Sequence, residues 1–156
     1  MLNDIIKNKS RFIEINNSIN SVVYYYKNRI IKEYNNEVLF KNELYWYNKL
    51  KDTNIIPKLV YYCLDKFTLI FENCGTNLKT STVDDNIRIR FKQILQILKI
   101  NNCIHNDLSK VKNGYLTNIL INNHGIIFII DFEWATYKGV KSNKPRIYND
   151  YDILKL

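Results

Sequence analysis

Glycine is scarce in this sequence: four of the 156 residues are glycine, and none precedes Gly75. A loop before Gly75 that must bring its backbone close to a ligand therefore cannot use the conformational freedom of glycine. Its turns must rely on the asparagines and serines of residues 16–21. These side chains favour turns, and asparagine tolerates left-handed backbone better than most residues.

Cysteine is also sparse and irregularly placed. Cys63, Cys74 and Cys103 are an odd number, and no pair has C-x-x-C spacing. The sequence therefore predicts no disulfide framework and indicates a reducing compartment. Adding His105 and His124 to these cysteines produces no zinc-ligand spacing. The sequence G-x-S-x-G is absent, which argues against a Ser-His-Asp hydrolase.

Long apolar runs are missing: no run approaches the roughly 18 residues that span a bilayer, and residues 1–10 lack a signal-peptide core. We therefore expect no membrane span and a soluble, cytoplasmic protein. Heavy use of Asn, Ile, Lys and Tyr indicates an AT-rich genome, such as that of a parasite or a large DNA virus. For a viral protein, the cytoplasm would be that of the host.

The formal net charge is +8, and basic surfaces bind nucleic-acid phosphates by releasing counterions. The lysines and arginines are nevertheless spread along the chain, with no run of four or more. A solvated basic surface is the simpler interpretation. An anionic partner such as RNA remains the alternative.

The length of 156 residues and the hydrophobic fraction of 46% indicate one globular domain with a real core. Five segments rich in β-branched and aromatic residues predict strands, and helical spacing of apolar residues predicts two helices. The predicted strands are residues 11–15, 22–26, 29–34, 59–63 and 67–71, and the predicted helices are residues 36–51 and 84–100. The fold class is therefore α+β, with an antiparallel sheet in the first half.

The densest cluster of chemical side chains follows the second predicted helix. Two apolar segments, residues 118–121 and 126–130, flank the turn Asn-Asn-His-Gly. If they pair as a hairpin, Asn118 and Asp131 lie at the same end of it, beside the loop that carries Asp107. Oxygen ligands of this kind suit Mg²⁺, which binds carboxylates together with substrate phosphates.

The stretch His105-Asn106-Asp107-Leu108, followed by an asparagine and then by Asp131-Phe132-Glu133, resembles the protein-kinase-like phosphotransferases. Their catalytic loop reads H-R-D-L-x-x-x-N and is followed by D-F-G. The HND and IDFE variants are closer to the atypical branch of RIO-like, lipopolysaccharide, choline and aminoglycoside kinases. The resemblance implies a two-lobed minimal kinase fold and an ATP- and Mg²⁺-dependent transfer to an unknown hydroxyl acceptor, either a protein or a small molecule.

The resemblance implies that Asp107 accepts the hydroxyl proton, while Asn118 and Asp131 hold Mg²⁺ on the nucleotide phosphates. The family's step from aspartate to asparagine is five residues, whereas Asp107 to Asn118 is eleven. We prefer Asn118 because it opens the predicted strand directly, and Asn113 stays the alternative. Asp107 has no lysine or arginine within two positions, so we expect its carboxylate to face the site.

By the same resemblance, Lys32 matches the strand lysine that reaches the α- and β-phosphates. Glu43 falls on the apolar helix stripe formed by Leu39, Trp46 and Leu50. A carboxylate there needs a cationic partner, and Lys32 is the natural candidate. Alternatively, Lys32 lies on an edge strand and points at solvent, and Glu43 lies at the edge of the stripe in water.

The resemblance also predicts the organisation of the chain as a single kinase-like domain. The N-lobe would be about residues 1–72, the hinge residues 72–77 and a reduced helical C-lobe residues 78–156. Glu72 and Cys74 lie in that hinge, where the backbone of the family binds adenine. We expect the peptide-binding helices of protein kinases to be absent. A weak or inactive kinase-like module that docks a protein or RNA, and an unrelated α+β binding domain, remain alternatives.

Overall fold

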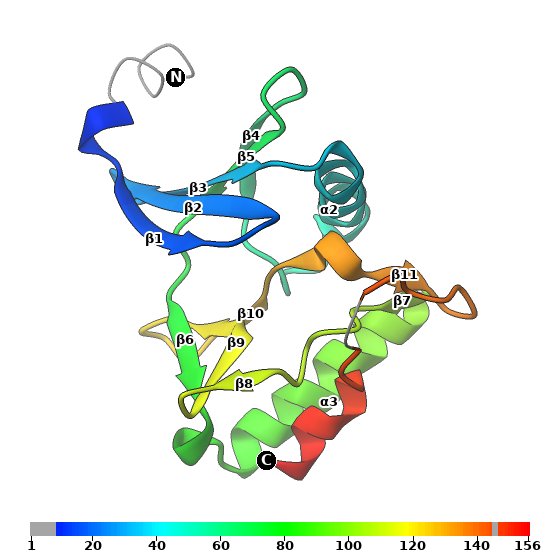
Figure 1. Cartoon of the computed structure of the whole chain (residues 1–156). Helices are drawn as coiled ribbons and strands as arrows, with labels where there is room; N and C mark the ends of the chain where they lie inside the picture. Colours follow the sequence, from blue (N-terminus) through cyan, green and yellow to red (C-terminus); the bar gives the residue numbers. More distant parts are fainter. Residues whose placement is uncertain (1–8, 145–146) are drawn as a thin grey trace. The chain divides into compact units, whose positions relative to one another are not determined.

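A computed structural model describes residues 9–144 and 147–156 (Figure 1). The chain divides into two compact units. The first comprises Met1–Phe40 and Lys58–Asn73, and the second comprises Lys41–Pro57 and Cys74–Leu156. Helix α2 begins in the first unit and continues into the second. The first eight residues of the predicted N-lobe lie outside the described residues.

The first unit is built on a five-stranded antiparallel sheet, as the sequence predicted, and its strand order is β1-β2-β3-β5-β4. A 3-10 turn, η1, precedes it. The elements are η1 (Lys9–Arg11), β1 (Ile13–Asn17), β2 (Ser21–Tyr26), β3 (Arg29–Tyr34), α2 (Glu37–Leu50), β4 (Leu59–Cys63) and β5 (Thr68–Glu72). The first strand starts two residues later than predicted, because residue 11 belongs to η1.

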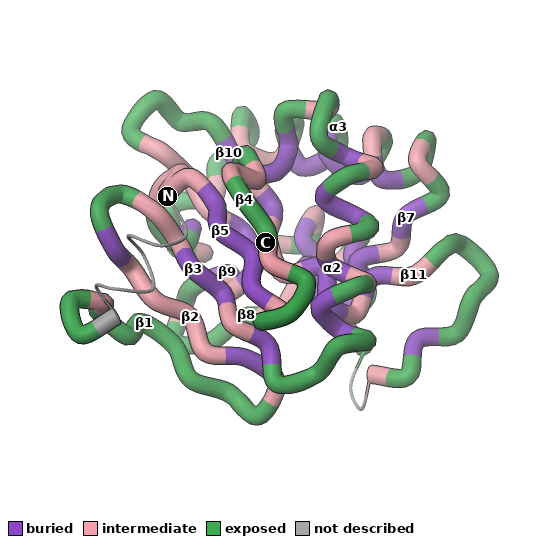
Figure 2. Tube along the Cα trace, turned by 90° about the horizontal axis from the view of Figure 1, so that it is seen from above, coloured by how far each residue is buried: buried purple, intermediate pink, exposed green. Residues whose placement is uncertain are grey.

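Strand β3 occupies the centre of this sheet and carries its core. Lys27 and Asn28 both have positive φ, 45° and 59°, and form a two-residue turn that pairs Tyr26 with Arg29. Turns of this kind match the twist of the flanking strands. Ile31 is 1% exposed, and Figure 2 shows β3 and β5 largely buried and β1 exposed.

The second unit combines one long helix with short strands. Its sheet has the order β10-β9-β6, with β8 also paired to β9, and β11 pairs with β7. The elements are β6 (Thr76–Lys79), η2 (Thr80–Thr82), α3 (Asp85–Ile100), β7 (Cys103–Ile104), β8 (Val111–Lys112), β9 (Tyr115–Ile121), β10 (Ile127–Ile129), η3 (Phe132–Trp134), β11 (Thr136–Tyr137) and η4 (Asp150–Lys155). Strands β6, β7, β8 and β11 were not predicted.

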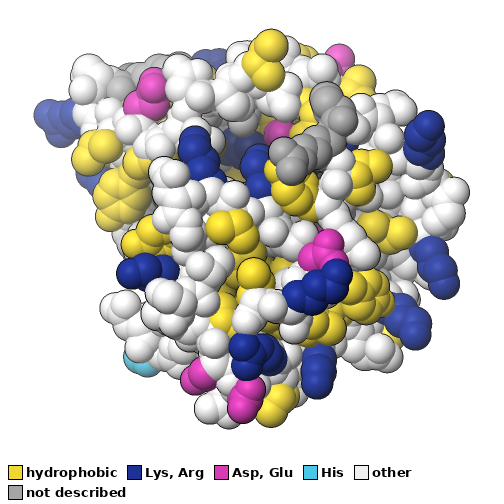
Figure 3. All heavy atoms as spheres, turned by 60° about the horizontal axis from the view of Figure 1, so that its bottom comes forward, with side chains coloured by type: hydrophobic (Ala, Val, Ile, Leu, Met, Phe, Trp, Pro, Cys, Tyr) yellow, Lys and Arg dark blue, Asp and Glu magenta, His cyan; other side chains and the backbone are white. Residues whose placement is uncertain are grey.

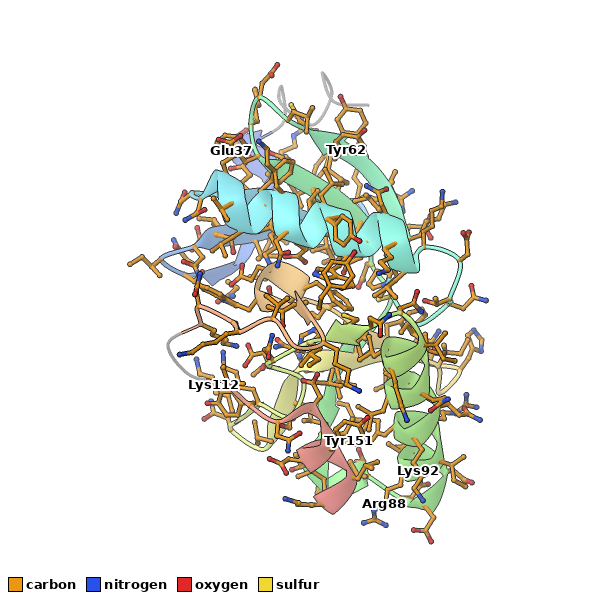
Figure 4. The ribbon with its side chains drawn as sticks, turned by 90° about the vertical axis from the view of Figure 1, so that its right-hand side faces the viewer. Glu37, Tyr62, Arg88, Lys92, Lys112 and Tyr151 are labelled. Atoms are coloured by element: carbon orange, nitrogen blue, oxygen red, sulfur yellow. The ribbon has the colours of Figure 1, made fainter. Side chains whose placement is uncertain are left out.

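Helix α3 begins where the sequence places a cap, because the side chain of Asp84 accepts a hydrogen bond of 2.8 Å from Ile87 N. Its buried face consists of Phe91, Ile94, Leu95 and Leu98. The 3-10 helix η4 runs beside α3 (Figure 4), and the Arg88 guanidinium donates to the Leu156 carbonyl at 2.8 Å. In the described parts of the chain, no helix has the length and apolarity that a membrane crossing requires.

The stretch predicted as the hinge, residues 72–77, ends in a strand. Thr76 and Asn77 belong to β6, and Thr76 pairs with Ile121 of β9. Gly75 permits this pairing: its φ is 139°, and an added Cβ would lie 2.2 Å from the Ile121 carbonyl oxygen. The glycine therefore serves a close approach of two backbones rather than a flexible linker.

Replacing Gly75 by alanine is expected to lower the free energy of unfolding by about 2–4 kcal/mol, because it adds left-handed strain and a backbone clash. Gly125→Ala is the control, since Gly125 has a φ of 73° but nothing within 4 Å of an added Cβ. Its cost should be only about 1–2 kcal/mol. Urea denaturation measures both. Equal losses in the two variants would show that the close approach is not the constraint.

Candidate active site

The HND loop (residues 105–110) lies between β7 and β8 of the second unit. His105 is fully buried, at 0% exposure. Its Nε2 lies 2.9 Å from the Ile130 carbonyl oxygen, and its ring packs edge-on against Phe132 with a centroid separation of 4.7 Å. These contacts join the loop to the end of the β9–β10 hairpin.

A carboxylate from η4 holds the backbone of the same loop. Asp150 Oδ2 accepts from the His105 backbone N–H at 2.6 Å, and Oδ1 accepts from Leu108 N–H at 3.4 Å. Burial raises the pKa of Asp150, while the charge of His105 and the backbone donors act in the opposite direction. Sequence reasoning missed Asp150, because its partners lie more than forty residues earlier.

Asn106 fixes the loop on its other side. Its φ is 68°, in the left-handed region that asparagine tolerates. Its Nδ2 donates to the Trp134 carbonyl at 2.9 Å and to Thr136 Oγ1 at 3.0 Å. The loop is therefore tied to the segment that follows the hairpin.

Asp107 differs from the expectation of a carboxylate without nearby cations. It is 2% exposed. Lys144 Nζ contacts its Oδ2 directly, and Lys110 Nζ lies 3.7 Å from the same oxygen. Lys110 is three positions and Lys144 is 37 positions after Asp107 in the sequence. The expectation considered only lysines and arginines within two positions of Asp107, so it included neither. Oδ1 of Asp107 is buried and has no hydrogen-bond partner among the described residues.

The eleven-residue step from Asp107 to Asn118 contains an extra strand pair. Asn113, with a φ of 52°, and Gly114 form the turn between β8 and β9, and Asn113 is exposed. Strand β9 consequently starts at Tyr115 rather than at residue 118. Asn118 is 3% exposed, and its Nδ2 donates to the Asp107 carbonyl at 3.0 Å.

The predicted hairpin is present, and its register places Asn118 opposite the residue before Asp131. Ile119 pairs with Ile129, and Ile130 N donates to the Asn118 carbonyl at 3.1 Å. Asp131 follows with φ 70° and ψ 58°, a left-handed conformation. Such conformations are costly for a residue with a Cβ and gather at functional sites.

Two further carboxylates lie near Asp131. One oxygen each from Glu43, Asp131 and Glu133 lie within 4.8 Å of one another. Glu43 is 1% exposed and Glu133 is 7% exposed, so the alternative in which Glu43 lies in water is wrong. Glu133 is the last residue of the IDFE motif, and the sequence predicted no role for it.

Helix α2 is fastened to the backbone that follows Asp131. Asn42 Nδ2 donates to the carbonyls of Glu133 and Ala135, both at 2.9 Å, and Trp46 Nε1 donates to the Ala135 carbonyl at 3.1 Å. These bonds fix the helical turn that carries Glu43. Asn42 and Trp46 have no signal in the sequence beyond their place on the helix.

In the first unit, Lys32 lies on the central strand β3, between Val23 of β2 and Leu69 of β5. It is 7% exposed, and its Nζ lies 4.8 Å from the centroid of the Tyr34 ring. The alternative of a solvent-facing lysine on an edge strand is therefore wrong. Lys32 and Glu43 belong to different units, and their ion pair stays a prediction.

The loop between β1 and β2 folds without glycine. Ser18 Oγ accepts from the Ser21 backbone N–H at 3.1 Å and donates to the Ser21 carbonyl, also at 3.1 Å. Asn35, which directly follows β3, contacts this turn: its backbone N–H donates to the Asn20 carbonyl at 2.8 Å. Serine and asparagine thus close this turn through side-chain hydrogen bonds.

Glu72 and Cys74, the hinge residues of the sequence prediction, lie on either side of the division between the units. Glu72 is the last residue of β5, and its carboxylate lies 3.9 Å from the Arg29 guanidinium. Burial raises the pKa of the Cys74 thiol to about 11, so this cysteine stays protonated and unreactive at neutral pH.

The sequence matches no protein-family model and no curated protein. The structure is similar to that of PK-1, a kinase of Cydia pomonella granulovirus, with a TM-score of 0.63 and 18% sequence identity. The similarity covers 89% of this chain and 60% of the viral kinase chain, so this chain spans about three fifths of that kinase. This likeness shows a kinase-like α+β fold, as the HND and IDFE motifs predicted.

Asp150→Ala is expected to lower the free energy of unfolding by about 2–3 kcal/mol, because two backbone N–H groups lose a charged acceptor. Asp150 also lines a pocket of about 470 Å³, through which water can reach these groups and limit the loss. Amide hydrogen exchange should show lost protection at His105 and Leu108. Asp152→Ala is the matched control, since Asp152 is half-exposed and pairs with the exposed Lys155, and it should change stability by less than about 0.5 kcal/mol. Unchanged protection in Asp150→Ala would contradict the anchoring role.

Proposed function

We propose that this chain is an ATP- and Mg²⁺-dependent phosphotransferase that moves the γ-phosphate to a hydroxyl acceptor. The observation that carries the proposal is the state of Asp107 within a kinase-like fold. Its carboxylate is buried on the HND loop, and Oδ1 has no hydrogen-bond partner among the described residues. An acceptor hydroxyl would supply the missing donor.

In the proposed reaction, the acceptor O–H donates its proton to Asp107 Oδ1 while the acceptor oxygen forms a bond to the γ-phosphorus. The bond between that phosphorus and the bridging oxygen of ADP breaks, and its electron pair leaves with ADP. Asp107 therefore orients the hydroxyl and takes its proton. The backbone bonds from Asp150 support this role, because they hold the peptide groups on both sides of Asp107.

Mg²⁺ fits the oxygen ligands at the end of the hairpin. Asp131 supplies a carboxylate, and Asn118 offers Oδ1 because its Nδ2 is already used by the Asp107 carbonyl. Glu133 is a further carboxylate within reach of Asp131. Bound there, Mg²⁺ would neutralise the charge on the nucleotide phosphates.

The nucleotide would be held from the first unit as well. The buried ammonium of Lys32 suits contact with the α- and β-phosphates, and Glu43 would keep Lys32 in place once nucleotide is bound. The backbone around Glu72 and Cys74 is the proposed adenine contact. On this proposal the two units act as the lobes of a kinase.

The phosphate acceptor is the open part of the proposal. On the face shown in Figure 3, lysine and arginine side chains are scattered among apolar and polar ones rather than gathered in one patch. On this face, the distribution is that of a solvated basic surface and not of an RNA-binding stripe.

A kinase-like binding module without transfer is the second candidate function. It is favoured by the turn at residues 18–21, which has no glycine to admit close contact between its backbone and the phosphates.

The function is tested with γ-labelled Mg·ATP and a panel of acceptors: a Ser/Thr/Tyr peptide pool, choline, an aminoglycoside, RNA and the chain itself. The wild-type chain should transfer label to one of them. Asp107→Asn should lower the transfer rate about 10²–10⁴-fold, the usual contribution of a general base. ATP binding, measured as the rise in melting temperature on adding ATP, should be retained. Asp65→Asn, an exposed carboxylate in the β4–β5 turn, is the control. Binding of Mg·ATP without transfer to any acceptor would establish the binding module instead.

Asn118→Ala is expected to weaken Mg²⁺-dependent ATP binding more than Asn113→Ala, because Asn118 lies on the hairpin opposite the residue before Asp131 and Asn113 lies on an exposed turn. Titrating Mg²⁺ at fixed ATP, with thermal stability as the readout, compares the two variants. A larger loss of metal dependence in Asn113→Ala would reverse the assignment.

A further inference from the structure

A lysine from the far end of the chain is built into the surroundings of Asp107. The basic segment (residues 138–144) follows β11 and ends at Lys144, whose Nζ contacts Asp107 Oδ2. The Lys144 side chain is only 9% exposed, and that of Asp107 is 3% exposed. Lys110, the other cation near this oxygen, lies 3.7 Å away and is 40% exposed. Lys144 is therefore the closer and less hydrated partner.

The ion pair distinguishes the two oxygens of the carboxylate. Both lysines approach Oδ2, whereas Oδ1 has no hydrogen-bond partner among the described residues. The backbone carbonyl of Asp107 is occupied by Asn118 Nδ2. Lys144 Nζ makes an ion pair with Oδ2 and no hydrogen bond among the described residues. The attraction between the two charges draws Oδ2 toward Lys144, which leaves Oδ1 as the oxygen for an acceptor hydroxyl.

Lys144 is itself held in place by the segment around it. Its backbone N–H donates to Ser142 Oγ at 3.2 Å, and its Nζ lies 5.7 Å from the centroid of the Tyr148 ring. The Tyr148 backbone N–H in turn donates to the Asn106 carbonyl at 2.9 Å. The lysine that contacts Asp107 is therefore close in the sequence to a residue whose backbone is bonded to the HND loop. Such support keeps a side chain in a productive geometry.

A buried ion pair is a weak source of net stability, because desolvation offsets most of the attraction between the charges. Stability alone therefore gives little reason for a lysine at this point. Its effect on Asp107 is more specific: it balances the buried negative charge and leaves one oxygen to accept a proton.

We propose that Lys144 is a positioning residue of the phosphoryl transfer, which holds Asp107 Oδ2 so that Oδ1 faces the acceptor hydroxyl. This inference rests on the phosphotransferase function proposed above. It assigns a role in the reaction to a segment that carries no part of the HND or IDFE motifs.

The test measures kcat, KM for ATP and ATP affinity in Lys144→Ala, with Mg·ATP and whichever acceptor of the panel described above the wild-type chain uses. The value of kcat should fall about tenfold or more, a part of the contribution of the general base. KM for ATP and ATP affinity should stay within about twofold, because Lys144 acts through Asp107. Lys144→Arg keeps the charge and should recover most of kcat. Lys141→Ala, an exposed lysine of the same segment, is the matched control and should behave as wild type.

A second comparison separates positioning from a merely structural role. In the Asp107→Asn background, Lys144→Ala should cause no further loss of kcat, because residues that act as a unit are not additive. A structural lysine would lower activity by the same factor in both backgrounds, and that result overturns the inference. A wild-type kcat in Lys144→Ala also overturns the inference.

If Lys144→Ala folds poorly, Lys144→Gln, which keeps a polar side chain without the charge, replaces it. A wild-type chain that transfers nothing overturns the phosphotransferase proposal and this inference together, whereas an active wild type with an insensitive Lys144 overturns this inference alone.

Discussion

The geometry of the HND loop depends on the buried carboxylate of Asp150. Burying an ionised carboxylate is costly unless hydrogen bonds replace its hydration. The backbone N–H groups of His105 and Leu108 supply these bonds, and the carboxylate in return fixes the peptide groups on both sides of Asp107. A loop without regular secondary structure thereby obtains a defined backbone from a side chain 45 residues beyond His105.

The parts of the fold that follow from local physics could be predicted from the sequence. Strands β3 and β4 have the predicted bounds, because β-branched and aromatic runs favour extended backbone over their own length. Helix α3 differs from its prediction only in that Asp84 is its cap rather than its first residue. The central position of Lys32 was implied by the family resemblance and not by the strand pattern, which left an edge strand open. The kinase-like fold itself rested on the HND and IDFE motifs.

What the sequence could not provide depends on distant contacts or on very short elements. Strand β8 has two residues, too few for an alternating pattern, although the Asn113-Gly114 pair is a strong hairpin signal. That signal was read only as a spacing between Asp107 and an asparagine. Gly75 lies in the predicted hinge (residues 72–77), and the approach of the Ile121 backbone to it has no trace in the local sequence.

Asp107 and Asp150 are both buried in the same small region, yet they are neutralised in different ways. Both oxygens of Asp150 accept backbone N–H bonds, at 2.6 and 3.4 Å, so both oxygens of this carboxylate are engaged in holding the loop. Asp107 is balanced by lysine side chains on Oδ2 and keeps Oδ1 without a hydrogen-bond partner in the described part of the chain. In the proposed reaction, Asp107 Oδ1 is the oxygen that takes the proton of the acceptor hydroxyl. The asymmetry between the two oxygens comes from Lys144, which lies outside the HND and IDFE motifs.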